Sequence, residues 1–346
     1  MVINSGQHRE MIQQVIDLFG VSVDHELQVM RANQSLAALT SRLIEKSDAI
    51  LAETRPDMVL VQGDTTSVLC AALASFYQRI PVGHVEAGLR TGNMRSPYPE
   101  EANRRLVSPL ADLHFAPTEA SRQALLAEKI REESIVVTGN TVVDALLMEL
   151  KRQELPAVQL QLRDKLLQLV GNDWLERRSI LVTGHRRENL GDGFEQICAA
   201  LAALSLRFPE TLIVYPVHLN PNVLQVVHER LEGTENIRLI EPQPYAEFVM
   251  LAKTSRLILT DSGGVQEEAP SLGKPVLVMR DTTERPEGVE AGTVKLVGAQ
   301  AERIVAEATR LLTDEAAYQA MAAVVNPYGD GRAAVRIVEE IDRFLR

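Results

Sequence analysis

The chain has little cysteine and few aromatic residues, and it lacks any long apolar run. Of its 346 residues only two are cysteines, Cys70 and Cys198, and one is tryptophan. Both cysteines lie within apolar helical patterns, which is typical of buried reduced thiols rather than of a disulfide or a metal pair. No apolar stretch approaches the roughly 18 residues of a membrane helix, and the first residues do not form a signal peptide. We therefore expect a cytoplasmic protein that does not contact a membrane.

Positive charge and several familiar motifs are also scarce. Lysine and arginine number 36 against 47 aspartate and glutamate, for a formal net charge of −11, which argues against a nucleic-acid partner. No G-x-G-x-x-G follows a strand, since the run Gly191-Asp-Gly193 lacks the third glycine, and no G-x-x-x-x-G-K-[ST] occurs. Nicotinamide binding and P-loop phosphoryl transfer therefore lose support. Because zinc spacings and D-x-D clusters are missing too, we expect neither a metal nor a cofactor.

What the sequence does contain is a regular alternation of short apolar runs and longer helical patterns. We expect strands at 2–4, 58–61, 82–85, 113–116, 135–138, 180–183, 212–215, 237–240, 257–260 and 276–279. This β-α alternation predicts an α/β fold of doubly wound parallel sheets, and the length suggests two domains. Because the alternation stops in the polar stretch 150–173, we place residues 1–140 with 332–346 in one domain and residues 141–331 in the other.

One short run, residues 257–270, carries the clearest functional signal. Its apolar strand is followed by Ser262, Gly263 and Gly264, and a helix opens directly after them. Backbone N–H groups and the positive end of a helix dipole then meet at one point, which is an arrangement that binds phosphate. Glu268, one turn into the helix, can accept hydrogen bonds from a ribose diol. We interpret the run as a cradle for a nucleoside diphosphate, the alternative being an ordinary strand-to-helix turn.

Carboxylates follow the expected strands of the first domain. Asp64 and Glu86 come just after two of them, and Glu100 and Glu101 open a helix further on. Ligands of α/β sheets bind at this edge, where carboxylates in different environments can divide acid and base roles. Each residue also has a structural interpretation. Asp64 can cap a helix, Glu86 can be buried with a partner, and Glu100 and Glu101 can complement a helix dipole.

The second domain presents a comparable set of polar side chains after its strands. His185 can donate to a phosphate or act as an acid, and His218 has the same potential, although either can be a structural histidine. Arg285 can clamp a diphosphate through two hydrogen bonds. Gln243 and Phe248 can meet a base by a hydrogen bond and an apolar contact.

Taken together, these segments resemble the non-hydrolysing UDP-N-acetylglucosamine 2-epimerases of bacteria, over essentially the whole chain. The matching segments are Gln7-His-Arg9, Gly63–Thr66, Gly83–Arg90, Pro97–Arg104, Thr138–Thr141, Thr183–Glu188, Pro216–Asn222, Thr260–Pro270 and Arg280–Glu287. The resemblance implies two Rossmann-like domains of the glycosyltransferase-B type, with UDP on the second domain and the active site in the cleft between them. It also implies a homodimer and a place in cell-surface polysaccharide biosynthesis.

The resemblance assigns roles residue by residue. The residues implied to bind the UDP-sugar are Gln243, Phe248, Ser262, Gly263, Gly264, Glu268 and Arg285. Those implied to be catalytic are Asp64, Glu86, Glu100 and His185. Some relatives carry a second, activating UDP-sugar site, whose counterparts here are Gln7, His8, Arg9 and Arg186.

The implied reaction interconverts UDP-N-acetylglucosamine and UDP-N-acetylmannosamine by elimination of UDP to 2-acetamidoglucal and its re-addition. Three alternatives stay open at this point: a glycosyltransferase of the same fold, a hydrolysing epimerase, and a UDP-sugar-binding protein without activity. Relatives begin with a further β-α unit that precedes the segment matching residues 1–10. We therefore expect the first sheet to lack a strand.

Overall fold

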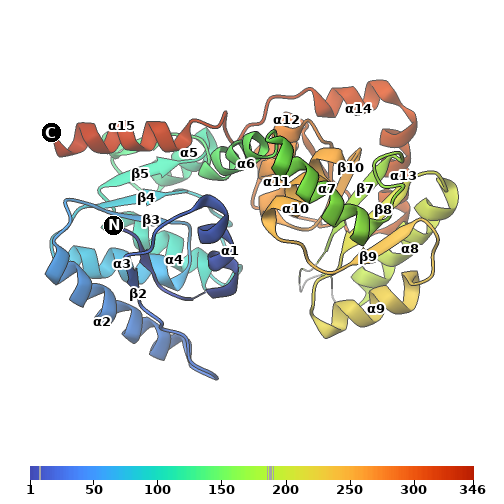
Figure 1. Ribbon diagram of the computed structural model, residues 1–346. Coiled ribbons are helices and arrows are strands. Elements are labelled where there is room, and N and C mark those ends of the chain that lie inside the picture. Colours follow the sequence, from blue (N-terminus) through green and yellow to red (C-terminus); the bar gives the residue numbers. More distant parts are fainter. Residues whose placement is uncertain (8, 185, 187–188, 190) are drawn as a thin grey trace. The chain divides into compact units, whose positions relative to one another are not determined.

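The computed structural model describes residues 1–346 except 8, 185, 187, 188 and 190 (Figure 1). The chain divides into two compact units, one made of residues 1–144 with 329–346 and the other of residues 145–328. Every strand pairing in both units is parallel, which confirms the expected α/β class. In the part of the chain that is described, no helix is long and apolar enough to cross a membrane.

The first unit contains a two-stranded sheet, β1-β2, and a four-stranded sheet in the order β3-β4-β5-β6. Its strands are β1 (Ile3–Asn4), β2 (His25–Glu26), β3 (Val59–Gln62), β4 (Val82–Val85), β5 (Leu113–Ala116) and β6 (Ile135–Val137). Its helices are α1 (Arg9–Phe19), α2 (Leu36–Thr54), α3 (Thr66–Tyr77), α4 (Glu100–Val107), α5 (Glu119–Ala127), the start of α6 (Thr141–Arg152) and α15 (Ala333–Leu345), with 3-10 turns at Ser108–Leu110 and Glu132–Ser134.

Helices cover both faces of the four-stranded sheet. Strands β4 and β5 are buried at every position, as expected of central parallel strands. Val68 of α3 and Val107 of α4 pack with β3 and β4 in one apolar cluster. Ile337 of α15 packs with Val85 and Phe115 in another, so the last helix of the chain completes the core of the first unit (Figure 1).

An apolar cavity lies between the small and the large sheet of the first unit. Among the described residues, β1 pairs with β2 only and β3 pairs with β4 only. The cavity between them has a volume of about 500 Å³ and is lined mainly by apolar side chains of α1, α2, α3 and the two strands, with Ser47 among them. The strands of the first unit therefore form two separate sheets.

The second unit is built on one six-stranded parallel sheet. Its strands are β7 (Ser179–Thr183), β8 (Leu212–Pro216), β9 (Ile237–Ile240), β10 (Leu257–Thr260), β11 (Val276–Val278) and β12 (Val294–Leu296). Its helices are the end of α6, α7 (Pro156–Val170), α8 (Asp192–Arg207), α9 (Pro221–Leu231), α10 (Tyr245–Thr254), α11 (Gly263–Glu268), α12 (Pro286–Ala291), α13 (Ala301–Thr313) and α14 (Glu315–Ala322), with a 3-10 turn at Ala269–Leu272.

The strand order of the second sheet, β12-β11-β10-β7-β8-β9, reverses between β7 and β10. The chain runs outward from β7 to β9 and then returns to the other side of β7. At such a reversal the loops after the two strands diverge and leave a crevice where ligands bind. One face of this sheet is closed by a large apolar core that includes Phe194 and Leu201 of α8 and Ile304 of α13.

The remaining differences from the sequence analysis are small. It does not predict β2 or β12, because strands of two or three residues carry too little periodicity to be recognised. The prediction for the cysteines is confirmed, since Cys70 and Cys198 are both free and buried. Burial raises the pKa of Cys70 to about 11 and that of Cys198 to about 12, so neither is a reactive thiolate.

Candidate functional site

The turn between β10 and α11 is fixed by hydrogen bonds among its own residues. β10 is buried throughout, and Thr260 Oγ1 at its end accepts a hydrogen bond from the Ser262 N–H at 2.9 Å. Gln266 Nε2 donates to the Ser262 carbonyl at 3.1 Å. A Cβ added at Gly264 would meet no atom within 4 Å, so a ligand can approach its backbone closely. The turn therefore has the rigidity and access that the phosphate-cradle interpretation needs.

Arg285 lies directly against this turn. A Cβ on Gly263 would be only 2.6 Å from the guanidinium carbon of Arg285, so glycine is what permits the approach. Arg285 Nε donates to Glu267 Oε1 at 2.6 Å, and Tyr328 Oη donates to the Arg285 carbonyl at 3.0 Å. Glu267 is buried, and the sequence analysis missed it because nothing in the sequence links it to a residue 18 positions later. The result is an oriented positive charge beside a Gly-rich turn, which suits an anionic ligand.

Helix α10 places Phe248 beside Glu268. The two side chains line one small, otherwise apolar space between α6, α10, β10 and α11. Tyr245 Oη, at the start of α10, donates to Glu268 Oε1 at 2.6 Å. Gln243 precedes this helix and donates to the carbonyl of Glu241 at 2.8 Å. The structure thus brings Phe248 and Glu268 together, whereas the hydrogen bond described for Gln243 stays within its own loop.

Asp261 ties the loop after β7 to the turn after β10. The side chain is fully buried, and its Oδ2 accepts from Arg186 N at 2.8 Å and from Asn189 Nδ2 at 3.3 Å. The predicted catalytic His185 belongs to this loop but lies outside the described residues, so its role stays a prediction. The other histidine, His218, accepts at Nδ1 from Asn220 N at 3.1 Å, within its own loop.

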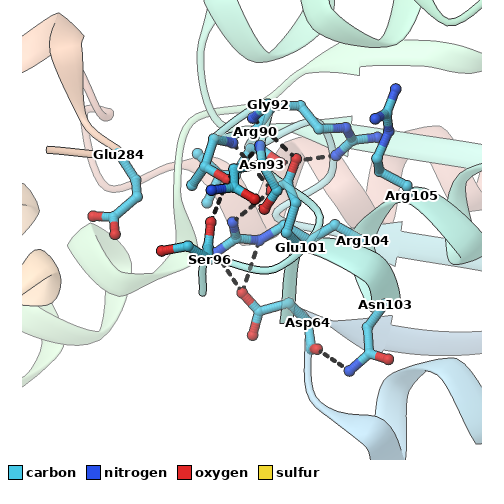
Figure 2. A network of polar contacts seen from close by, with 12 residues as sticks. Asp64, Arg90, Gly92, Asn93, Ser96, Glu101, Asn103, Arg104, Arg105 and Glu284 are labelled. Atoms are coloured by element: carbon cyan, nitrogen blue, oxygen red, sulfur yellow. Dashed lines mark hydrogen bonds and ion pairs between the residues drawn. The ribbon is translucent and has the colours of Figure 1, made fainter. Parts of the chain in front are cut away.

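In the first unit, Asp64 follows β3 and is held by α4. Arg104 Nη2 and Nε lie 2.6 Å and 2.9 Å from Asp64 Oδ2, and Asn103 Nδ2 donates to the Asp64 carbonyl at 2.8 Å (Figure 2). The capping interpretation of Asp64 is wrong, because Thr65 is the N-cap residue of α3 and the Asp64 carboxylate binds Arg104 instead. A buried arginine therefore fixes the orientation of the first candidate carboxylate.

Glu86 follows β4 as Asp64 follows β3, and the two strands are neighbours in the sheet. A Cβ added at Gly63 would lie 3.5 Å from Glu86 Oε2. Glu86 is half-buried and has φ of 64°, a left-handed conformation that is unfavourable for glutamate and has to be maintained by the surrounding structure. His84 Nε2 lies 2.8 Å from the Gly63 carbonyl. Burial lowers the pKa of His84 to about 4, so the ring is neutral at pH 7 and donates from Nε2 to the turn before Asp64.

The two adjacent glutamates at the start of α4 have different environments. Glu101 is fully buried; its carboxylate accepts from the N–H groups of Thr91 and Gly92 at 3.0 Å and 3.2 Å, and pairs with Arg104 Nη1 at 3.2 Å (Figure 2). Glu100 is half-buried and lies one helical turn before Arg104 on the same face of α4. Glu101 is thus a structural anchor, which leaves Glu100 as the candidate for chemistry.

The residues implied for a second UDP-sugar site are only partly described. Gln7 Oε1 accepts from Ser67 N at 3.2 Å and from Ser67 Oγ at 2.6 Å, which ties the N-terminal segment to α3. His8 lies outside the described residues, and the side chain of Arg9 is not described. Arg186 belongs to the second unit. The proposed activating role of these residues stays a prediction. In the described part of the chain, no group of three or more His, Cys, Asp or Glu side chains is arranged to hold a metal ion.

Comparison with known proteins decides the family. A family model described as UDP-N-acetylglucosamine 2-epimerase matches residues 1–342. This chain belongs to that family. The UDP-N-acetylglucosamine 2-epimerase of Yersinia pestis is 56% identical over 338 residues, which cover 97% of this chain and 89% of that protein. The enzyme of the same name from Escherichia coli (strain K12) is 55% identical over 341 residues, with the same coverage of 97% and 89%.

Solved structures of UDP-N-acetylglucosamine 2-epimerases share the fold. The enzyme of Neisseria meningitidis, bound to UDP-GlcNAc, has a TM-score of 0.90 and 49% identity, covering 97% of this chain and 90% of that one. The enzyme of Methanocaldococcus jannaschii, in complex with UDP-GlcNAc and UDP, has a TM-score of 0.79 and 33% identity, covering 96% of this chain and 88% of that one. The expected fold of two Rossmann-like units of the glycosyltransferase-B type is therefore confirmed.

Proposed function

We propose that this protein catalyses the reversible epimerisation at C2 of UDP-N-acetylglucosamine to UDP-N-acetylmannosamine. The observation that carries the proposal is the acidic group at the ends of β3 and β4. There the Glu86 carboxylate lies close to Gly63, the residue before Asp64, and Arg104 of α4 joins Asp64 to the helix that begins with Glu100. A protein that only binds a nucleotide sugar needs no such group. Membership in the epimerase family and the relative bound to UDP-GlcNAc support the same activity.

The second unit supplies the nucleotide site in this proposal. The turn Ser262–Gly264 and the guanidinium of Arg285 suit the diphosphate. The carboxylate of Glu268 suits the ribose hydroxyls, and Phe248 with Gln243 suits the uracil. His185, which lies outside the described residues, is proposed as a catalytic residue because the resemblance assigns it that role. The relative in complex with UDP-GlcNAc and UDP supports a site that holds both the substrate and the leaving nucleotide.

The chemistry explains why both sets of residues are needed. The C2 proton of the sugar is not adjacent to a carbonyl group, so removing it alone is very unfavourable. A carboxylate can instead take this proton while the C1–O bond breaks. The electron pair of the C1–O bond leaves with the diphosphate, the electron pair of the C2–H bond forms the C1–C2 double bond, and 2-acetamidoglucal results. UDP then returns to C1 while a second carboxylic acid delivers a proton to the opposite face of C2. Preorganised donors at the diphosphate stabilise the charge that develops on the leaving group.

Incubation with UDP-N-acetylglucosamine in deuterium oxide tests the proposal. We expect both epimers to be recovered with one deuterium at C2, because the proton returned to C2 comes from a group that exchanges with solvent. A glycosyltransferase would leave the C2–H bond intact. A hydrolysing epimerase would release UDP in step with free N-acetylmannosamine, and a binding protein would bind UDP without converting the sugar. Any of these three results contradicts the proposed activity.

We also propose that the protein is a cytoplasmic homodimer that needs no cofactor, as the resemblance implies. Sedimentation equilibrium measures the assembly directly: the proposal predicts a particle of twice the chain mass of 38.2 kDa, and a single species at that chain mass contradicts it.

A further inference from the structure

Tyr245 forms a close pair with Glu268 in the second unit, and the proposed function gives Tyr245 no role. Tyr245 is the first residue of α10, and Glu268 is the last residue of α11. The phenol Oη donates to Glu268 Oε1 at 2.6 Å. Glu268 is only 9% exposed. The bond therefore fixes one carboxylate oxygen and leaves Oε2 as the second acceptor of the group.

The surroundings of Glu268 make this hydrogen bond its main source of stabilisation. Among the described residues, none of the ion pairs includes Glu268, and the small space beside it is lined by apolar side chains of α6, α10, β10 and α11. The ionisable groups that face the pair are Glu267 on α11 and Glu149 on α6, both acidic. Each of these neighbours is paired with an arginine, Glu267 with Arg285 and Glu149 with Arg152. Since neither arginine is paired with Glu268 in the described part of the chain, the charged form of this buried carboxylate depends on its own hydrogen-bond donors.

Tyr245 is itself held in place by its neighbours. Pro244 precedes it, and Gln153 Nε2 at the end of α6 donates to the Ala246 carbonyl at 2.9 Å. The same amide donates to Glu149 Oε1 at 2.7 Å, so the start of α10 is tied to α6 by a buried network. The phenol therefore approaches Glu268 from a fixed helix end.

We propose that Tyr245 is a positioning residue, which orients the Glu268 carboxylate so that it accepts hydrogen bonds from the ribose diol of a UDP ligand and thereby favours ribonucleotides over 2′-deoxyribonucleotides. This inference rests on the proposed function only in taking UDP as the ligand of the second unit. α10 also carries Phe248 one turn later, next to Glu268. One helix thus sets the contact to the base and the geometry of the contact to the ribose.

The protonation of Glu268 gives this role a measurable signature. Burial raises the pKa of Glu268 to about 7, the Tyr245 hydrogen bond opposes this rise, and Glu267 adds to it. A protonated carboxyl group can accept fewer hydrogen bonds from the diol, so UDP affinity should increase as pH rises through about 7. Removing the phenol hydroxyl removes the one contribution that lowers the pKa. The midpoint should then move to higher pH.

The test compares Tyr245→Phe, which removes one oxygen atom, with the wild type by calorimetric titration of UDP and 2′-deoxy-UDP between about pH 6 and pH 8.5. At pH 7 we expect UDP to bind roughly tenfold more weakly to Y245F, the effect of losing a hydrogen bond to a charged group. We expect 2′-deoxy-UDP to lose less, so that the preference for the ribonucleotide shrinks. Recovery of UDP affinity near pH 8.5 is the signature that a general loss of packing would not produce.

Three controls complete the experiment. Glu268→Gln reports the titration of the ligand alone, and combining it with Tyr245→Phe should give less than the sum of the two effects, because the residues act as one unit. Tyr77→Phe removes a hydroxyl from an exposed tyrosine of the first unit and should change nothing. With UDP-N-acetylglucosamine as substrate, KM should rise in Y245F by a larger factor than kcat falls.

Unchanged UDP affinity and an unchanged pH midpoint in Y245F would overturn the inference. If Y245F does not fold, the wild type and Glu268→Gln are compared with each other. If UDP affinity has the same pH profile in both proteins, Glu268 does not have the role that Tyr245 is proposed to serve. These titrations need no turnover. If no deuterium enters at C2 but the UDP titrations give the expected pH profile, the epimerase activity alone is rejected. If deuterium enters at C2 but the titrations do not give that profile, the role of Tyr245 alone is rejected.

Discussion

Exchanging single atoms in the adjacent glutamates of α4 should separate catalysis from stability. We predict that Glu101→Gln destabilises the first unit and that Glu100→Gln does not. The Glu101 carboxylate accepts from Thr91 N and Gly92 N and pairs with Arg104, so an amide in its place must turn an NH₂ group toward one of these donors. It also removes the negative charge that faces Arg104. Losing about one to two hydrogen bonds to a charged group lowers the free energy of unfolding by about 3 kcal/mol.

Calorimetry and a turnover assay measure the two effects. For a unit of this size, about 3 kcal/mol lowers Tm by roughly 6–12 °C. Glu100 is half-buried, and a glutamine there should change the free energy of unfolding by less than about 0.5 kcal/mol. It should reduce kcat by about 10²–10⁴-fold, the usual loss when a general acid or base is removed. The reasoning is refuted if Glu100→Gln lowers Tm as much as Glu101→Gln, or if Glu100→Gln keeps full activity.

Ser47 of α2 lines the cavity between β1 and β3, so the leucine side chain of Ser47→Leu should fill part of it and raise the free energy of unfolding by about 1 kcal/mol. Ser41→Leu, on the exposed face of the same helix, should not raise it. Equal changes of Tm in the two variants would contradict this prediction. The pKa of His84 falls from 6.5 to about 4 on folding, so between these values the unfolded chain binds a proton that the folded chain does not. The contribution of His84 to stability is therefore full above about pH 6.5 and falls by about 1.4 kcal/mol per pH unit below it, roughly 3 kcal/mol in all. Urea denaturation at several pH values should show a smaller slope in His84→Gln, which keeps the buried His114 whose pKa burial also lowers, than in the wild type, and equal slopes would argue against this role of His84. Arg285→Lys should weaken UDP binding about tenfold, because it removes the planar guanidinium group that Glu267 holds against Gly263. An unchanged Kd in a calorimetric titration would show that Arg285 does not contact the ligand.

The sequence predicts what depends on strand ends and on turn chemistry. It places Asp64 and Glu86 after consecutive strands, and parallel pairing of β3 with β4 puts both residues at the same edge of the sheet. The turn after β10 is equally visible, because Ser262 and two glycines interrupt an apolar run. The central strands and most helices follow from the same alternation of apolar runs.

Contacts between residues far apart in the sequence could not be predicted. The bond between Arg104 and Asp64 joins positions 40 residues apart, and it depends on the angle at which α4 meets the sheet. The different environments of Glu100 and Glu101 depend on the rotation of α4 about its axis, which the charges in its first turn do not reveal. The bond between Tyr245 and Glu268 connects two helices across 23 residues. Such pairs need the packed core before they can be identified.

The most direct test of the account follows the bond between the sugar and the diphosphate. UDP-N-acetylglucosamine with a heavy oxygen isotope in the bridge between C1 and the β-phosphorus is incubated with the enzyme, and its position is followed by phosphorus NMR. If UDP leaves and returns, rotation of its terminal phosphate moves the label out of the bridge at a rate comparable to that of epimerisation. Formation of the epimer with all of the label still in the bridge would contradict the account.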